Sequence, residues 1–228
     1  MFFCQFLFRQ LGDPVENPTF GQHIFIRIMS TIVDQFLKGL KERLPEEDNE
    51  DLSYAVGATD EEIARLKERY PQTPDSLVYL LKQINGTYHQ QYGDRKIAVL
   101  MLGSDVGEYP YYLKSVDQIL KEKMYNESIR ERYDTYFDEI SELVGEGIDP
   151  DVPVQSWLHF SDCMNNGGTS SLYIDFNPAP GGTPGQIVRF LHDPDSYKVI
   201  APSFDQYLQD LVDKDYDFIL EEDEDDFY

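Results

Sequence analysis

The spacing of apolar residues between positions 157 and 212 changes from a strand pattern to a helical pattern. Four runs rich in aromatic and β-branched residues have the composition of strands, and they lie at 157–160, 172–176, 186–191 and 197–201. After the last run the apolar residues recur with helical spacing, and Ser203 stands at the position of an N-cap. The pattern therefore predicts a β-meander that is closed by a helix.

The connection between the second and third runs, residues 177–185, holds three prolines and three glycines. This composition cannot support a regular ladder, so the chain is expected to turn there. Asp175 stands just before the loop, inside an apolar strand, where a carboxylate must be hydrogen-bonded or must face the surface. Strand alternation places Tyr173 and Asp175 on the same face, so we expect Asp175 either to anchor the loop or to be presented to a partner.

Helical periodicity dominates the N-terminal part of the chain. Apolar residues between 31 and 44 fall on one face of an amphipathic helix. A capping-box pattern at Thr59 begins a second helix, and a third is predicted from 75 to about 84, with Gly86 in its left-handed C-cap. The charged residues 45–51 between the first two helices are interpreted as a linker.

Two further elements are predicted in the middle of the chain. Residues 97–102 form a nearly continuous apolar run, which favours a central strand covered on both faces. Apolar residues between 116 and 144 indicate one long helix or two helices joined near Asn126. The predicted fold class is α+β, with a mainly antiparallel sheet of five to six strands flanked by N-terminal, inserted and C-terminal helices.

Several motifs follow one another in a specific order. Trp157 opens a strand, Asp175 is followed by Asn-Pro, a Gly-rich link leads to Gly-Gln-Ile-Val at 185–188, and the last helix begins Ser-Phe-x-x-Tyr-Leu. This order, together with Gly-Ala-Thr-Asp-Glu-Glu-Ile at 57–63, resembles the SMI1/KNR4 family, also called SUKH, over about residues 53–212. The resemblance implies structural roles for the motif residues, which are Gly86, Trp157, Asp175, Gly185, Ser203, Phe204 and Leu208.

The resemblance also implies a class of function. Bacterial members of the family are regarded as immunity proteins, which bind and neutralise the toxin domains of secreted toxins, many of them directed at nucleic acids. Fungal members act as regulatory scaffolds in cell-wall signalling. By this resemblance the chain is a cytoplasmic protein-binding module, not an enzyme, and it uses no cofactor.

Both ends of the chain differ from this predicted domain. Residues 1–28 form a doubtful leader, and we expect translation to begin at Met29 because the first amphipathic helix follows at once. Residues 29–52 comprise that helix and the charged linker. Residues 213–228 form an acidic tail with nine acids and one lysine. The tail is interpreted either as a solvated segment or as an arm that docks on a basic partner through its aromatic residues, which are Phe218, Phe227 and Tyr228.

The charge of the chain excludes some partners. Forty-three acidic and nineteen basic side chains give a formal net charge of −24. Such a field repels nucleic acid and anionic lipid and attracts basic proteins, so neither nucleic acid nor membrane is expected as a partner. The two cysteines, Cys4 and Cys163, follow no disulfide framework, which is typical of a reducing compartment.

Motifs for catalysis are weak. His159, Asp162 and Cys163 lie close enough in sequence to suggest a metal site, but a strand leading into a turn is expected to point them in different directions. Gly-rich segments at 167–171 and 181–185 lack the spacing of a phosphate-binding loop. A hydrolase that uses His159, Asp162 and Asp175 is therefore placed third, after the two hypotheses that follow.

The first hypothesis is an immunity protein that occludes a cognate toxin domain, which we expect to be a basic protein. Acids steer such an encounter and tyrosines supply contact area at low entropic cost. The candidate contact residues are Asp105, Glu108, Tyr109, Tyr111, Tyr112, Asp162 and Asp175. The segment from Asp105 to Tyr112 is equally open to interpretation as an ordinary solvated loop. The second hypothesis is a regulatory interaction scaffold of the SMI1/KNR4 type that uses the same surface and the tail.

Overall fold

The computed structural model describes residues 20–107, 109–122, 126–165 and 169–219, with side chains from residue 32 onward. Most of the predicted leader and the end of the acidic tail, including Phe227 and Tyr228, lie outside these residues. The first helix, α1 (Phe20–Arg43), includes Met29, the residue at which translation was predicted to begin. Among the described helices, none combines the length and the apolar character that crossing a bilayer requires.

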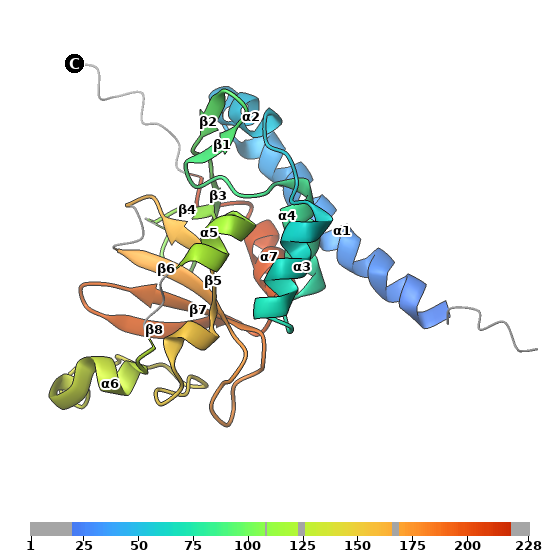
Figure 1. Cartoon of the computed structure of the whole chain (residues 1–228). Coiled ribbons are helices and arrows are strands. Elements are labelled where there is room, and N and C mark those ends of the chain that lie inside the picture. The colour runs from blue at the N-terminus through green and yellow to red at the C-terminus, as the bar shows by residue number, and fades with distance from the viewer. Residues whose placement is uncertain (1–19, 108, 123–125, 166–168, 220–228) are drawn as a thin grey trace, which may run out of the picture.

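Six antiparallel strands form the main sheet, in the order β3-β4-β5-β6-β7-β8 (Figure 1). The predicted α+β class with a mainly antiparallel sheet is therefore confirmed, and the predicted meander corresponds to β5–β8. A separate hairpin consists of β1 and β2. The strands are β1 Gln90–Tyr92, β2 Arg95–Ile97, β3 Leu100–Leu102, β4 Tyr111–Leu113, β5 Leu158–Cys163, β6 Ser170–Asp175, β7 Gln186–Leu191 and β8 Ser196–Ala201.

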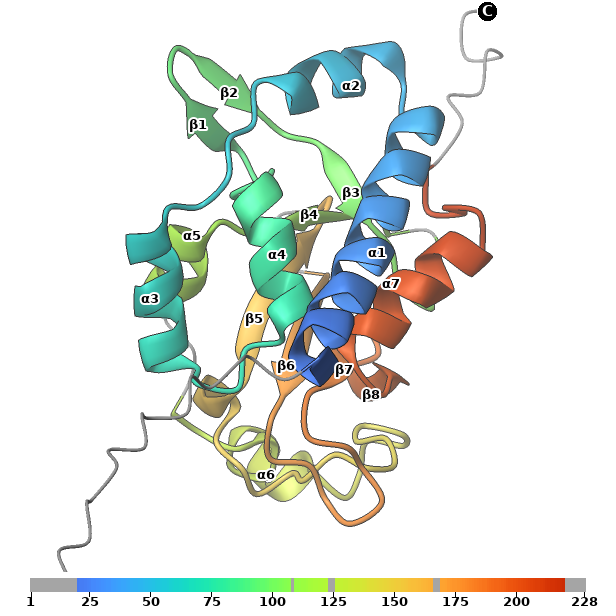
Figure 2. The same ribbon diagram turned by 90° about the vertical axis from the view of Figure 1, so that its right-hand side faces the viewer.

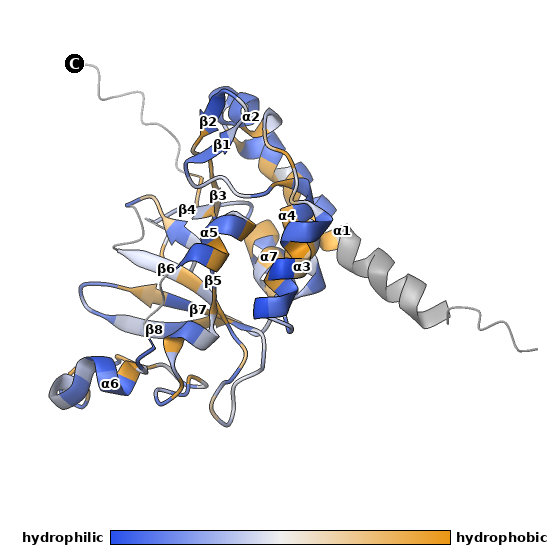
Figure 3. Cartoon of the chain, in the orientation of Figure 1, coloured by the Kyte–Doolittle hydropathy of each residue, from blue (hydrophilic) through white to orange (hydrophobic). Residues whose placement is uncertain are grey.

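Helices cover one face of this sheet, and α1, α4 and α7 lie side by side on it (Figure 2). Their apolar stripes meet the sheet in one core, where Phe36, Leu80, Phe160 and Phe204 are fully buried. Figure 3 shows hydrophobic positions in orange among hydrophilic ones along these helices, as amphipathic helices require. The remaining helices are α2 Glu46–Ser53, α3 Asp60–Arg69, α4 Asp75–Gln83, α5 Val116–Lys121, α6 Ile129–Tyr133 and α7 Phe204–Asp213.

A second apolar cluster covers part of the opposite face, which we call the outer face. Side chains from the segment 127–156, among them Ile129 and Leu143, pack there on residues of β6, β7 and β8. Trp157 is fully buried in this cluster, with its ring 5.8 Å from that of Tyr173 and 6.1 Å from that of Tyr197. The outer face over β4 and β5 instead carries polar side chains, which form the candidate site below.

The helix-start signals of the sequence are confirmed. The side chains of Thr59 and Glu62 form a reciprocal capping box on α3, and Ser203 accepts a hydrogen bond from the Gln206 N–H at the start of α7. Gly86 has a left-handed φ of 91°, as predicted. However, α4 already ends at Gln83, and a Cβ on Gly86 would overlap the backbone of Ser115, so close packing also requires glycine there.

The predicted linker at 45–51 is wrong, because these residues begin α2. Its first turn contains three acids, Glu46, Glu47 and Asp48, whose negative charges stabilise the positive end of the helix dipole. Buried Leu52 anchors its other end in the core. A run of charges can therefore be helical when its acids stand at the N-terminus and one apolar residue is buried.

The long helix predicted over 116–144 is also wrong. Two capping boxes, at Ser115 and Ser128, start the short helices α5 and α6. Positive φ values at Asp134 (43°) and Glu142 (63°) interrupt helical geometry beyond α6. The apolar residues of α5 pack in the helix-covered core. Those between 129 and 144 pack on the outer face of the sheet, and this tertiary packing outweighs their helical spacing.

Two smaller predictions are corrected as well. The apolar run at 97–102 divides between β2 and β3, and β3 lies at the edge of the main sheet instead of its centre. Phe218, expected to be a contact point in the acidic tail, is 1% exposed and packs beside Tyr216 in the core. The folded part of the chain therefore continues past the predicted boundary at 213.

Candidate functional site

A bulge in β5 places two ionisable residues on the outer face of the sheet. His159 lies opposite Tyr173 on β6, whereas Ser161 lies opposite Leu172, so β5 has one extra residue at this point. The extra residue shifts the alternation of the strand. As a result, Nε2 of His159 lies 2.7 Å from Oδ1 of Asp162. The expectation that the side chains of His159, Asp162 and Cys163 point in different directions is therefore wrong for His159 and Asp162, whereas Cys163 is buried in the core under the helices.

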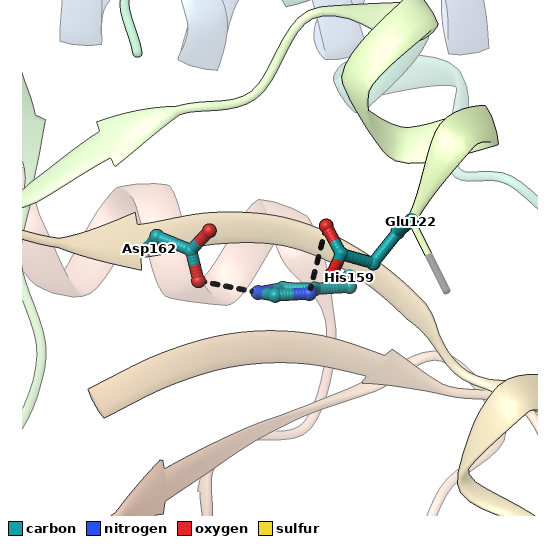
Figure 4. A group of neighbouring side chains, drawn as sticks. All are labelled: Glu122, His159 and Asp162. Carbon is teal, nitrogen blue, oxygen red and sulfur yellow. Dashed lines mark hydrogen bonds and ion pairs between the residues drawn. The ribbon is translucent and has the colours of Figure 1, made fainter. Parts of the chain in front are cut away.

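Lys114 and Glu122 complete the cluster. Lys114 follows β4, and its Nζ lies 2.8 Å from Oδ2 of Asp162 and 2.5 Å from Oε2 of Glu122. The same Nζ is 3.4 Å from Nδ1 of His159. Figure 4 shows Glu122, at the end of α5, on one side of the imidazole and Asp162 on the other. We call these four residues the outer-face polar cluster.

Three of the four side chains in this cluster are buried, so their charges must be paired with one another. The side chains of Lys114, His159 and Asp162 are 3%, 7% and 8% exposed, and Glu122 is 33% exposed. Burial alone raises the pKa of Asp162, but its neighbours His159 and Lys114 outweigh this effect and hold the pKa well below its usual range. The Ser171 hydroxyl also donates to Asp162, at 2.9 Å.

The cluster fits an internal ion-pair network better than a metal site. Glu122, His159 and Asp162 each offer a ligand atom, and these atoms lie within 4.8 Å of one another. However, the Lys114 ammonium already contacts both carboxylates, so it supplies the positive charge that a cation would bring. A metal would have to displace a buried lysine and leave its charge without a counterion.

The predicted contact residues do not form one exposed surface. Tyr111 is fully buried, with its hydroxyl 2.6 Å from the Ser170 oxygen, and Tyr112 is 9% exposed. Tyr109 is half-buried. Asp105 pairs with Arg189 and Lys198 at 2.6 and 2.8 Å, and Glu108 lies outside the described residues. Asp162 belongs to the polar cluster described above.

Asp175 anchors the Pro/Gly-rich loop. It is 0% exposed and accepts hydrogen bonds from the Asn177 N–H at 2.8 Å and from the Gln186 amide at 3.0 Å. Burial raises its pKa, and these donors only partly offset that effect. Of the two roles that the sequence left open, the loop anchor is the one that the structure shows. A buried side chain of this kind cannot be presented to a partner without local unfolding.

Lys114 and Glu122 were not among the residues predicted from the sequence. Neither belongs to a motif, and they stand 45 and 37 residues before His159. The only local signal is that Lys114 directly follows the aromatic and apolar run 111–113, where a lysine is unusual inside a strand-like segment. The contact itself depends on the pairing of β4 with β5, which local sequence does not reveal.

Acidic side chains also gather in the segment that covers the outer face. Residues 127–151 contain nine acids and two arginines. Tyr136 in this segment is 64% exposed. An exposed aromatic residue among unbalanced negative charges is typical of a surface that meets a basic partner.

Comparison with known proteins agrees with the resemblance seen in the sequence. The model of the SMI1 / KNR4 family (SUKH-1) matches residues 57–210. This match includes all six strands of the main sheet and the outer-face polar cluster. No curated protein matches the chain.

Proposed function

Because the chain belongs to the SMI1/KNR4 family (SUKH-1), we propose that it is an immunity protein that binds a cognate toxin domain and blocks it by occlusion. The toxin domain is a basic protein directed at nucleic acid. The chain acts as a stoichiometric inhibitor without turnover, and it requires neither cofactor nor metal.

The distribution of charge carries this proposal. Residues 57–210 hold 25 acidic and 13 basic side chains, a net charge of −12, so half of the total of −24 belongs to the family domain. The acidic field is therefore not confined to the tail. A toxin that acts on nucleic acid needs a cationic cleft for phosphate groups, and an anionic surface is complementary to such a cleft. Complementary fields raise association rates up to about 10⁸–10⁹ M⁻¹s⁻¹.

The outer-face polar cluster favours a structural role over catalysis. Each of its four ionisable side chains has a partner inside the cluster, and the serine nearby donates to Asp162. A general base must be able to reach a substrate proton, and a nucleophile needs an adjacent free base. This network offers neither, which favours a structural role for His159 and Asp162 over the hydrolase hypothesis.

Co-expression in a bacterial host tests the proposal. The toxin domain encoded next to this chain is expressed from an inducible promoter, with and without the chain. We expect survival only with the chain, and a one-to-one complex on size-exclusion chromatography. Death of the host in both cases, together with separate elution of the two proteins, would reject the immunity function.

The regulatory scaffold remains the second candidate, and the acidic tail favours it. Residues 213–228 carry nine acids and one lysine, and this net charge of −8 suits contact with basic segments of endogenous proteins. Removal of residues 220–228 separates the two candidates. An immunity protein that acts through its folded domain keeps its toxin affinity within about threefold, whereas a tail-dependent scaffold loses most of its binding to endogenous partners.

A further inference from the structure

Two adjoining hollows lie along the outer edge of β8, the last strand of the main sheet. One has a volume of 340 Å³ and runs beside Val199, Ala201 and Pro202. The other has a volume of 550 Å³ and lies between the Glu142–Glu146 segment and the start of β8. Glu146 and Val199 line both hollows, so the two form one groove, which we call the β8 groove. None of its lining residues belongs to the outer-face polar cluster.

The edge of β8 is only partly paired. The Tyr197 N–H donates to the Leu143 carbonyl at 2.7 Å, and the Gly145 N–H donates to the Tyr197 carbonyl at 2.8 Å. These bonds make a short parallel bridge between the 143–145 segment and β8. The segment leaves the edge after Gly145. Val199, two residues beyond Tyr197, directs its backbone groups to the same side, away from β7.

We propose that the β8 groove binds an extended, basic segment of the partner, which adds as a parallel strand beside Val199 and continues the pairing that residues 143–145 begin. This inference rests on the proposed function for the identity of the partner and deepens it by naming the contact surface. Strand addition supplies affinity through the backbone and specificity through alternate side chains.

The charge at the rim sets the basic character of the segment. Glu142 and Glu146 are exposed, and within the described residues neither has an ion pair or a side-chain hydrogen bond. The two basic residues of the groove, Arg189 and Lys198, are both paired with Asp105. Arg189 and Lys198 share the single charge of Asp105, so these three residues and the two glutamates together carry a net charge of −1. The acids without an ion pair are Glu142 and Glu146, and they would attract a lysine or arginine of the added strand.

The floor of the groove suits the close approach of a backbone. Three glycines, Gly147, Gly181 and Gly182, line it beside Thr183 and Gln186, and a Cβ would meet open space only at Gly181. Val199–Pro202 line the groove, although β8 itself ends at Ala201 and has a bulge at Ile200. At about 3.3 Å per residue, an extended chain of three or four residues would cover about 10–13 Å of this wall. Apolar side chains of the segment would rest on Val199 and Ile200, which are half-buried.

A displayed library of random dodecapeptides, selected against the intact chain, tests the proposal. We expect the selected peptides to alternate lysine or arginine with β-branched residues. Their affinity should fall at least about tenfold with the double variant Glu142→Lys/Glu146→Lys. The matched control is Asp138→Lys/Glu139→Lys, which makes the same charge change on exposed residues of the same segment outside the groove. It should change the affinity by less than about threefold.

The backbone contact is tested with N-methylated versions of one selected peptide. In strand addition only alternate N–H groups of the peptide face β8, so N-methylation should weaken binding about tenfold at every second position and have little effect between. The proposal would be overturned if both charge variants lowered the peptide affinity equally, or if methylation had the same effect at all positions. It would also be overturned if no peptides were selected. If the Glu142→Lys/Glu146→Lys variant neutralised the toxin as well as the wild type does, this surface would be rejected as the contact and the immunity function would stand.

Discussion

Replacement of Lys114 by methionine should destabilise the fold strongly, because it leaves buried carboxylate charge without its cation. Methionine keeps the length and most of the volume of lysine but loses both ion pairs. Removal of one partner from a buried ion pair costs about 3–5 kcal/mol. Asp162 retains hydrogen bonds from His159 and Ser171, and Glu122 is partly exposed, so we expect the lower end of that range, about 3 kcal/mol.

Urea unfolding at pH 7.5 measures this loss. With a slope of about 2–3 kcal/mol/M, the midpoint should fall by about 1 M or more. The control is Lys121→Met, which removes an exposed pair with Asp117 and should cost less than about 0.5 kcal/mol. The double variant Lys114→Met/Asp162→Asn should recover part of the loss, because it removes the unpaired charge as well.

The same variant has a defined pH dependence. The lowered pKa of Asp162 means that the ionised carboxylate stabilises the wild type above the ordinary aspartate pKa of about 4, and this contribution is lost as the pH falls further. Without Lys114 the folded-state pKa rises toward the ordinary value, so protonation relieves the variant and its deficit should shrink as the pH falls through about 4. A deficit below about 1 kcal/mol at pH 7.5, or one equal to that of Lys121→Met, would refute the ion-pair account.

Three further predictions concern packing and the buried loop anchor. Gly57→Ala should cost about 3 kcal/mol because its Cβ would overlap the Lys82 carbonyl oxygen, whereas Gly107→Ala, which meets open space, should change the free energy of unfolding by less than about 0.5 kcal/mol. Phe218→Ala should cost about 3–5 kcal/mol in urea unfolding, and a loss below about 1 kcal/mol would show that the chain does not pack beyond 213. Burial raises the pKa of Asp175, so its stabilising contribution should be lost as the pH rises through the folded-state pKa. The wild type should therefore lose stability relative to Asp175→Asn as the pH rises above about 4, and a constant difference would contradict the raised pKa.

Local signals in the sequence predicted the parts of the fold that local chemistry determines. The capping residues Thr59 and Ser203 act on neighbours within one turn, and the turns of the meander depend on their own glycines and prolines. Predictions failed where packing between distant segments decided the outcome. The apolar residues from 129 to 144 had helical spacing, yet they pack over the outer face of the sheet.

In the candidate site, too, local sequence signals were read correctly and contacts between distant segments were missed. His159 and Asp162 were found in the sequence, but their contact depends on a bulge at position 160, which no turn or capping signal marks. The partners Lys114 and Glu122 reach them only through the pairing of β4 with β5 and the position of α5. The β8 groove likewise joins residues about 50 positions apart, so its glutamates looked like ordinary surface acids in the sequence.

The most direct measurement of the proposed function is a titration of the toxin domain's activity with the purified chain. A binding protein without turnover predicts a linear fall that reaches zero at one equivalent, and a binding rate that decreases as salt screens the acidic surface. Complete inactivation by less than about a tenth of an equivalent would reveal turnover, and full activity with excess chain would show that the toxin is not its partner; either result would contradict the account.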